Sequence, residues 1–261
     1  MKICVLFLFS AALLYPSIGW GLPPDQRALK AREVLIEHGR ELTIDELAAK
    51  KQEFVQLLTN NRLKTEAARE LLPTYYYDGK NLFERSNPAG SVPVYLVAGF
   101  CSKATPELFE FLGELEDVLR RRAKADDETS LMLSKDVYCQ ALRVARELTF
   151  ERGDLRTCLE VVRMGLSSPS AQDRCDSSLM LRKLIKATPG RGVGDLLSSE
   201  QILSLLDNLE KRERYALNQT EPSLLRSSLL SSATLDRVEN IREFIGTGVW
   251  KKPRIQAEPI Y

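Results

Sequence analysis

A single apolar stripe along residues 105–122 predicts the clearest helix of the chain. Its members recur at intervals of three, four and seven residues: Leu108, Phe111, Leu112, Leu115, Val118 and Leu119. This spacing places them on one face, because an α-helix has about 3.6 residues per turn. Thr105-Pro106-Glu107 predicts the helix start, with Thr105 as the cap and a proline in the first turn. Arg120-Arg121-Arg122 closes the helix, where basic side chains complement its dipole.

Similar patterns predict helices over most of the remaining chain. Thr43-Ile44-Asp45-Glu46 matches a capping box, in which the Thr43 hydroxyl and the Glu46 carboxylate satisfy free backbone N–H groups at a helix start. Gly39 is interpreted as the stop of a preceding helix. Further helices are expected at 62–72, 129–150, 154–166, 171–187, 198–217, 222–230 and 233–245. The pattern therefore predicts an all-α protein of stacked antiparallel helical hairpins.

Residues 73–104 are the least regular part of the pattern. Three tyrosines lie in this segment directly before an Asp-Gly pair: Tyr75, Tyr76 and Tyr77. They are compatible with a short hairpin or with an ordered loop. Residues 92–100 are compatible with a buried strand or a short helix that has a proline in its first turn, and the helix is preferred. If the three tyrosines are exposed, they form a protein-binding surface; if they pack on helices, they belong to the core.

The expected helices recur with a regular spacing. Their starts at 105, 129, 154, 171 and 198, taken two at a time, are 42 to 49 residues apart. Within 154–187 the apolar and charged positions are Leu155, Leu159 and Val162 in the first helix, and Asp173, Arg174, Leu179 and Leu184 in the second. This pattern resembles the α-helical repeats of HEAT and armadillo proteins, over about residues 92–245. The resemblance implies an α-solenoid architecture and no particular activity.

The first 21 residues have the features of a cleavable signal peptide. Met1-Lys2 supplies a positive start, and residues 3–15 are apolar apart from one serine. Such a run fits the hydrophobic region of a signal peptide and is too short to span a bilayer. Small residues at Gly19 and Gly21 favour a cut before Leu22, and a cut after Gly19 is the second choice. We therefore expect an exported protein, periplasmic or extracellular, without stable membrane insertion after cleavage.

The mature chain is expected to have four segments and no net charge. They are N-terminal helices over 22–72, the irregular segment 73–104, a helical-repeat-like region over 105–250 and an extended, loosely held tail over 251–261. Loss of Lys2 with the signal peptide lowers the formal net charge from +1 to zero. A neutral chain has no long-range attraction for nucleic acid or anionic lipid. Nucleic acid is therefore not expected as a partner.

Four cysteines remain after cleavage: Cys101, Cys139, Cys158 and Cys175. An even number in an exported chain suggests two disulfides, with buried free thiols as the alternative. In an antiparallel hairpin of helices 154–166 and 171–187, Cys158 and Cys175 differ by about 6 Å along the axis, near the limit for a bridge. We therefore expect Cys158–Cys175 as one pair and Cys101–Cys139 as the other.

Residues that carry catalytic chemistry are sparse. His38 is the only histidine, and it lies near a helix end, where an imidazolium is favoured. The chain has no HExxH zinc motif, no Walker phosphate loop and no nucleophile elbow, so no catalytic residue, cofactor or metal is assigned. These features favour a non-catalytic exported protein that binds another protein, as an interaction or scaffold module of the cell envelope. A hydrolase that uses carboxylates alone and a helical carrier of an apolar ligand are the alternatives.

Overall fold

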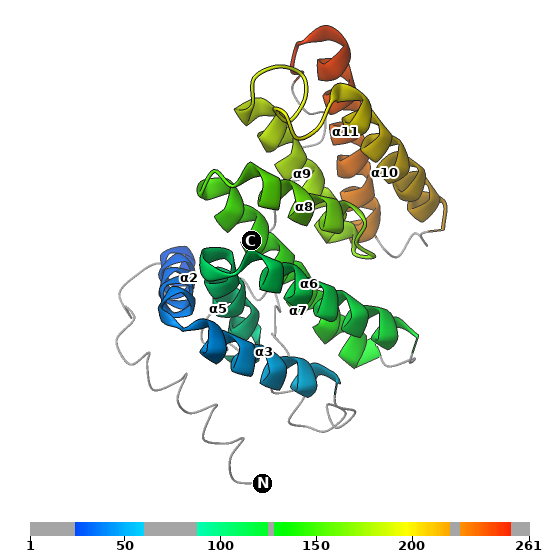
Figure 1. Ribbon diagram of the computed structural model, residues 1–261. Coiled ribbons are helices and arrows are strands. Elements are labelled where there is room, and N and C mark those ends of the chain that lie inside the picture. The colour runs from blue at the N-terminus through cyan, green and yellow to red at the C-terminus, as the bar shows by residue number, and fades with distance from the viewer. Residues whose placement is uncertain (1–23, 60–87, 125–127, 220–224, 252–261) are drawn as a thin grey trace. The chain divides into compact units, whose positions relative to one another are not determined.

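The computed structural model describes residues 24–59, 88–124, 128–219 and 225–251, and the regular elements in these ranges are helices (Figure 1). In chain order they are α2 (Pro24–Glu41), α3 (Ile44–Thr59), α5 (Pro88–Lys103), α6 (Thr105–Ala123), α7 (Glu128–Glu151), α8 (Leu155–Leu166), α9 (Ala171–Ala187), α10 (Ser199–Gln219) and α11 (Leu225–Thr247). The prediction of an all-α fold is confirmed for the described residues. Two compact units, 1–144 and 145–261, divide the chain within α7.

In the first unit, α5 packs against α2, α3 and α6. Its side chains Leu96, Val97 and Phe100 are almost fully buried. The ring of Phe111 on α6 contacts Phe100 on α5 and Phe54 on α3, at centroid distances of 5.9 and 6.5 Å. The six positions of the predicted stripe on α6 are all buried. The hydrophobic spacing therefore identified the correct face of this helix.

Two glycines let the backbones of α2 and α5 approach closely. A Cβ added at Gly39 would lie less than 3.0 Å from the backbone carbonyl oxygen of Tyr95. A Cβ at Gly99 would lie 2.7 Å from the carbonyl oxygen of Gly39 and would also meet Leu47. The prediction that Gly39 stops a helix is wrong, because α2 continues to Glu41. Gly39 is a packing residue inside the helix.

The predicted capping box at the start of α3 is confirmed. The Thr43 N–H donates to the Glu46 carboxylate at 2.8 Å, and the Glu46 N–H donates to the Thr43 hydroxyl at 3.2 Å. The bond from the Thr43 backbone lowers the pKa of Glu46 below its usual value. The predicted cap at Thr105 is wrong, because α6 has Ala104 at its N-cap and no side-chain bond there. The first turn of α6 keeps Pro106, which needs no N–H partner.

The irregular segment predicted at 73–104 is wrong for its second half, where α5 forms. The preferred helix over 92–100 is confirmed, although α5 begins earlier and places Pro93 inside. The pattern placed Pro93 in the first turn, where a proline costs little. Inside α5 it destabilises the helix, and burial of residues such as Leu96 against three neighbouring helices offsets this cost. Tyr75, Tyr76 and Tyr77 and the helix expected at 62–72 lie outside the described residues.

In the second unit, α9 packs against α8 and α11, and α10 packs against α11. Consecutive helices thus pair as expected for helical hairpins, while the α-solenoid arrangement stays a prediction. The core of this unit also includes Val193 and Leu197, which lie in the turn between α9 and α10. The Val193 N–H donates to the Leu197 carbonyl at 3.0 Å within this turn. Its members from the helices include Leu159, Val162, Leu181, Leu184, Ile202, Leu206, Val238 and Ile241.

The helices predicted separately at 222–230 and 233–245 are joined in the single helix α11 from residue 225 onward, and residues 222–224 lie outside the described part. Polar residues lie where the two predicted helices meet, and they are Ser231, Ser232 and Thr234. In the structure Ser231 and Thr234 are buried, and the Thr234 hydroxyl donates to the Leu230 carbonyl at 2.8 Å. A hydroxyl that bonds the preceding turn needs no partner outside the helix, so these residues are compatible with a continuous one.

A buried ion pair joins α9 to α10. The Arg174 guanidinium binds the Glu213 carboxylate, and the exposed fractions of the two side chains are 5% and 0%. Arg174 Nη1 also donates to the carbonyls of Ser168 and Pro169, at 3.0 and 2.9 Å. Arg174 therefore holds both α10 and the turn between α8 and α9, and Glu213 supplies the charge that makes its burial possible.

Candidate functional site

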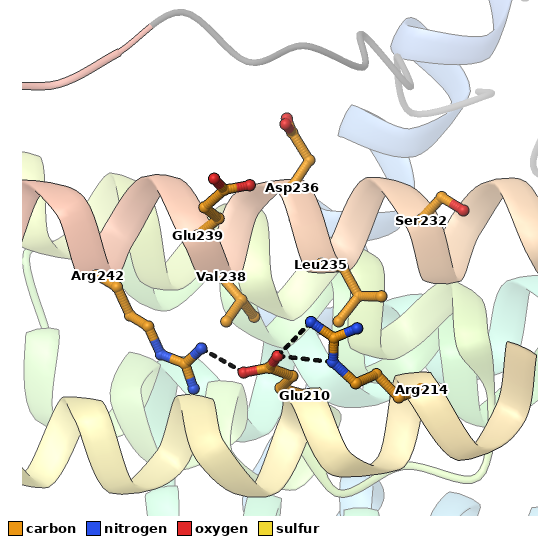
Figure 2. Close-up of a pocket in the computed structure, with 8 residues that line it drawn as sticks. All are labelled: Glu210, Arg214, Ser232, Leu235, Asp236, Val238, Glu239 and Arg242. Atoms are coloured by element: carbon orange, nitrogen blue, oxygen red, sulfur yellow. Dashed lines mark hydrogen bonds and ion pairs between the residues drawn. The ribbon is translucent and has the colours of Figure 1, made fainter.

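A groove of about 360 Å³ lies between α10 and α11 in the second unit (Figure 2). We call it the α10–α11 groove. Helix α10 contributes Glu210 and Arg214, and α11 contributes Ser232, Leu235, Asp236, Val238, Glu239 and Arg242. The two helices pack against each other, and apolar residues such as Leu206 on α10 and Ile241 on α11 face the core, which leaves mainly polar side chains to line the groove. Five of the eight lining side chains are therefore ionisable.

Glu210 is the centre of an ion-pair network in the α10–α11 groove. Its carboxylate pairs with Arg214 one turn later on α10, at 2.7 Å, and with Arg242 on α11. Arg242 also pairs with Asp207, one turn before Glu210. The bonds from Arg214 and Arg242 hold the pKa of Glu210 below its ordinary value. Glu210 is therefore ionised at neutral pH and fixes the two guanidinium groups.

The carboxylates of the groove do not converge. Figure 2 shows Glu210 between the helices with both arginines directed at it, whereas Asp236 and Glu239 point away from it. General acid and base catalysis by two carboxylates needs both groups beside one reacting bond, with one of them protonated. Neither condition holds at Glu210. The alternative of a carboxylate hydrolase gains no support from this groove.

The predicted disulfides are wrong, because no disulfide joins any two of the described cysteines Cys101, Cys139, Cys158 and Cys175. The side chains of the expected pair on α8 and α9 contact different neighbours. The Cys158 thiol donates to the carbonyl of Arg146 on α7 at 3.5 Å, whereas the Cys175 sulfur accepts from Arg237 on α11 at 2.8 Å. Axial offset alone could not reveal this, since rotation about each helix axis decides which way a thiol points.

We expect Cys158 to be alkylated slowly in the folded protein. Burial raises the pKa of its thiol to about 11, and the thiolate is the reactive form. At pH 8 about one thiol in a thousand is then ionised. Timed reaction with iodoacetamide at pH 8, followed by peptide mass spectrometry, should modify Cys158 at least tenfold more slowly than the half-buried Cys139.

Two controls accompany that measurement. The two cysteines should react at similar rates in denaturant, and the native rate at Cys158 should rise as the pH approaches 11. Equal rates in the native protein, or a Cys158 peptide linked to another cysteine, would contradict the free buried thiol.

His38 has a packing role. Its ring is half-buried on α2 and meets the edge of Tyr95 on α5 at a centroid distance of 5.4 Å. Burial raises the pKa of the Tyr95 hydroxyl to about 12, so this tyrosine is neutral at physiological pH. Among the residues that the structure describes, no group of three or more His, Cys, Asp and Glu side chains could hold a metal ion.

Sequence reasoning missed the α10–α11 groove. The four-residue spacing of Glu210 and Arg214 on a predicted helix was a readable signal for an ion pair. Nothing in the sequence indicated that Arg242, 32 residues beyond Glu210, would join it.

Within the described helices, none is long and apolar enough to cross a membrane. Comparison of the chain with protein-family models, with curated proteins and with solved structures found no match.

Proposed function

We propose that this chain is a non-catalytic exported protein that binds a protein partner, as an interaction or scaffold module of the cell envelope. The observation that carries the proposal is the α10–α11 groove, with its fixed arginines. Export rests on the signal-peptide pattern of residues 1–21. The partner contact is proposed for the groove together with Leu229, a large apolar side chain that is 60% exposed on α11.

Leu229 belongs to the same face of α11 as part of the groove. It precedes Ser232 by three residues and Asp236 by seven, and helical residues at these spacings lie on one side. Both of those residues line the groove. Leu229 extends this face with exposed apolar area, and the groove supplies arginine, a residue type that is enriched among those that contribute most of the binding energy at interfaces.

Preorganisation supports binding at this place. The Arg214 side chain is 66% exposed, yet Glu210 holds its guanidinium at 2.7 Å. A side chain that is already ordered loses less conformational entropy when a partner covers it. Glu210 is meanwhile ionised and occupied by two arginines, which suits a structural role better than proton transfer.

The proposal is tested by site-specific photo-crosslinking in the native host. A photoreactive amino acid replaces Leu229 in one exported chain and Ile44, an exposed residue of the first unit, in the control. We expect one discrete protein to be crosslinked from position 229 and none from position 44. Arg214→Glu should lower the yield at least tenfold, because it removes a fixed cation and places a second carboxylate beside Glu210.

Two results would contradict the proposal. Equal crosslinking from positions 229 and 44, insensitive to Arg214→Glu, would mean that the contact is non-specific or lies elsewhere. Hydrolysis of ester, peptide, phosphate or glycan substrates at a rate that follows the protein through purification would contradict the non-catalytic assignment.

A further inference from the structure

The chain folds back after α11 and places Trp250 on the core of the second unit. Gly248 reverses the direction with a φ of +79°, a left-handed conformation that glycine adopts without strain. The carbonyl of Lys251 then accepts a bond of 2.8 Å from Asn240 on α11. The predicted loosely held tail is therefore wrong at Lys251, and residues 252–261 lie outside the described part.

Trp250 lies between an aromatic ring and two cations. Its indole stacks on Phe244 of α11, with ring centroids 4.1 Å apart and planes 9° from parallel. Arg182 and Lys186, one turn apart on α9, each place their charge 5.2 Å from the centroid of the Trp250 ring. Contact with the aromatic ring holds both charges in one place.

These two cations lack the carboxylate partner that several cations of the second unit have. Arg174 pairs with Glu213, Arg242 with Glu210, and Lys251 with Glu243. Within the described residues, neither Arg182 nor Lys186 forms an ion pair. The Nε of Arg182 is also buried there without a hydrogen-bond partner.

The charges around Arg182 and Lys186 are unbalanced. Burial, followed by the neighbouring charge of Arg237, lowers the pKa of Arg182, and Asp236 opposes this only in part. Burial, followed by Arg182, lowers the pKa of Lys186. Arg237 itself is engaged with the carbonyl and sulfur of Cys175. An anion beside Arg182 and Lys186 would relieve this repulsion.

We propose that Arg182 and Lys186 together bind a phosphate group. A phosphate monoester carries a charge of about −1.5 to −2 at neutral pH, which matches two cations, and it offers three strong acceptor oxygens to their N–H groups. A carboxylate would leave one charge uncompensated. The ligand class is a small phosphate-bearing molecule or a phospholipid headgroup. The proposal is independent of the partner contact at the α10–α11 groove.

The test uses Trp250 as its own reporter. The chain has two tryptophans, Trp20 and Trp250, so Trp20→Phe in the full chain leaves one. Its fluorescence is recorded during titration with inorganic phosphate at pH 7.5, with sodium chloride holding the ionic strength constant. We expect a saturable change, because phosphate draws the two cations away from the indole. The same ionic strength from chloride alone should give no change.

Variants separate the two cations from general surface charge. Arg182→Gln with Lys186→Gln should weaken the phosphate response at least tenfold, while Lys183→Gln, at the exposed lysine between them, should leave it unchanged. Lys186→Gln alone removes only an exposed charge, and it should weaken the response by itself if the double variant does not fold. The proposal would be overturned if Lys183→Gln weakened the response equally. It would also be overturned if the wild-type response did not saturate and chloride reproduced it, and the two cations would then have only a packing role on Trp250.

Vesicles identify the source of the phosphate. A lipid headgroup would be supported if the protein co-sediments with phosphatidylglycerol vesicles but not with phosphatidylcholine vesicles. This binding should be lost in the double variant and should be competed by inorganic phosphate. A saturable phosphate response without vesicle binding would support a soluble phosphorylated ligand.

Discussion

Glu213→Ala is expected to lower the free energy of unfolding of the second unit by about 3–5 kcal/mol. Arg174 is 5% exposed, and Glu213 compensates its charge in the interior. Removing the carboxylate leaves a buried cation whose remaining partners are the neutral carbonyls of Ser168 and Pro169. Urea unfolding followed by Trp250 fluorescence, in the chain with Trp20→Phe, measures the loss in the unit that contains the pair.

Glu160→Ala is the matched control for Glu213→Ala. Glu160 pairs with Arg163 at 2.7 Å on α8, but the two side chains are 45% and 38% exposed. Water can replace the lost partner at such a site, so the change should cost no more than about 1 kcal/mol. The double variant Arg174→Met with Glu213→Leu should be less destabilised than Glu213→Ala, because it removes both charges. Similar losses for Glu213→Ala and Glu160→Ala would show that burial does not govern the pair.

Gly39→Ala is expected to destabilise the first unit by about 2–3 kcal/mol. The new methyl group would lie less than 3.0 Å from the Tyr95 carbonyl oxygen. That oxygen belongs to the backbone of α5 and cannot rotate away, so α2 must move off the helix that it packs against. The loss should exceed the gain of about 1 kcal/mol that alanine normally brings to a helix interior. Urea unfolding by far-ultraviolet circular dichroism gives the change.

Gly113→Ala supplies the opposite control in the same unit. Gly113 lies inside α6, and a Cβ there meets no atom within 4 Å. Only helix propensity then acts, and stability should rise by about 0.5–1 kcal/mol. If both glycine variants were stabilised, the close approach of α2 to α5 would be refuted.

The apolar face of α6 was predictable from the sequence because a helix repeats its environment every three to four residues. The capping box at Thr43 and Glu46 was equally readable, since both partners lie within one turn. Gly39 was misread for the converse reason. The residues around a glycine look alike in sequence whether the glycine ends a helix or lets two helices cross closely. Only the position of the Tyr95 backbone, 56 residues later, distinguishes the two cases.

The candidate sites depended on tertiary structure more than the helices did. Glu210 and Arg214 could be paired from their spacing, but Arg242 reaches Glu210 only because α11 folds back along α10. The cysteines show the same limit, since their number suggested disulfides and the rotation of α8 and α9 directs Cys158 and Cys175 at different neighbours.

The sequence by itself determined the helical class, the buried face of α6 and the capping box of α3, because these depend on interactions within a few residues. Only the tertiary structure decided that Glu213 compensates Arg174, that Arg242 completes the α10–α11 groove and that Trp250 meets Arg182 and Lys186. Each of these contacts joins residues more than 30 positions apart. Their formation depends on how whole helices pack and rotate, which local periodicity does not encode.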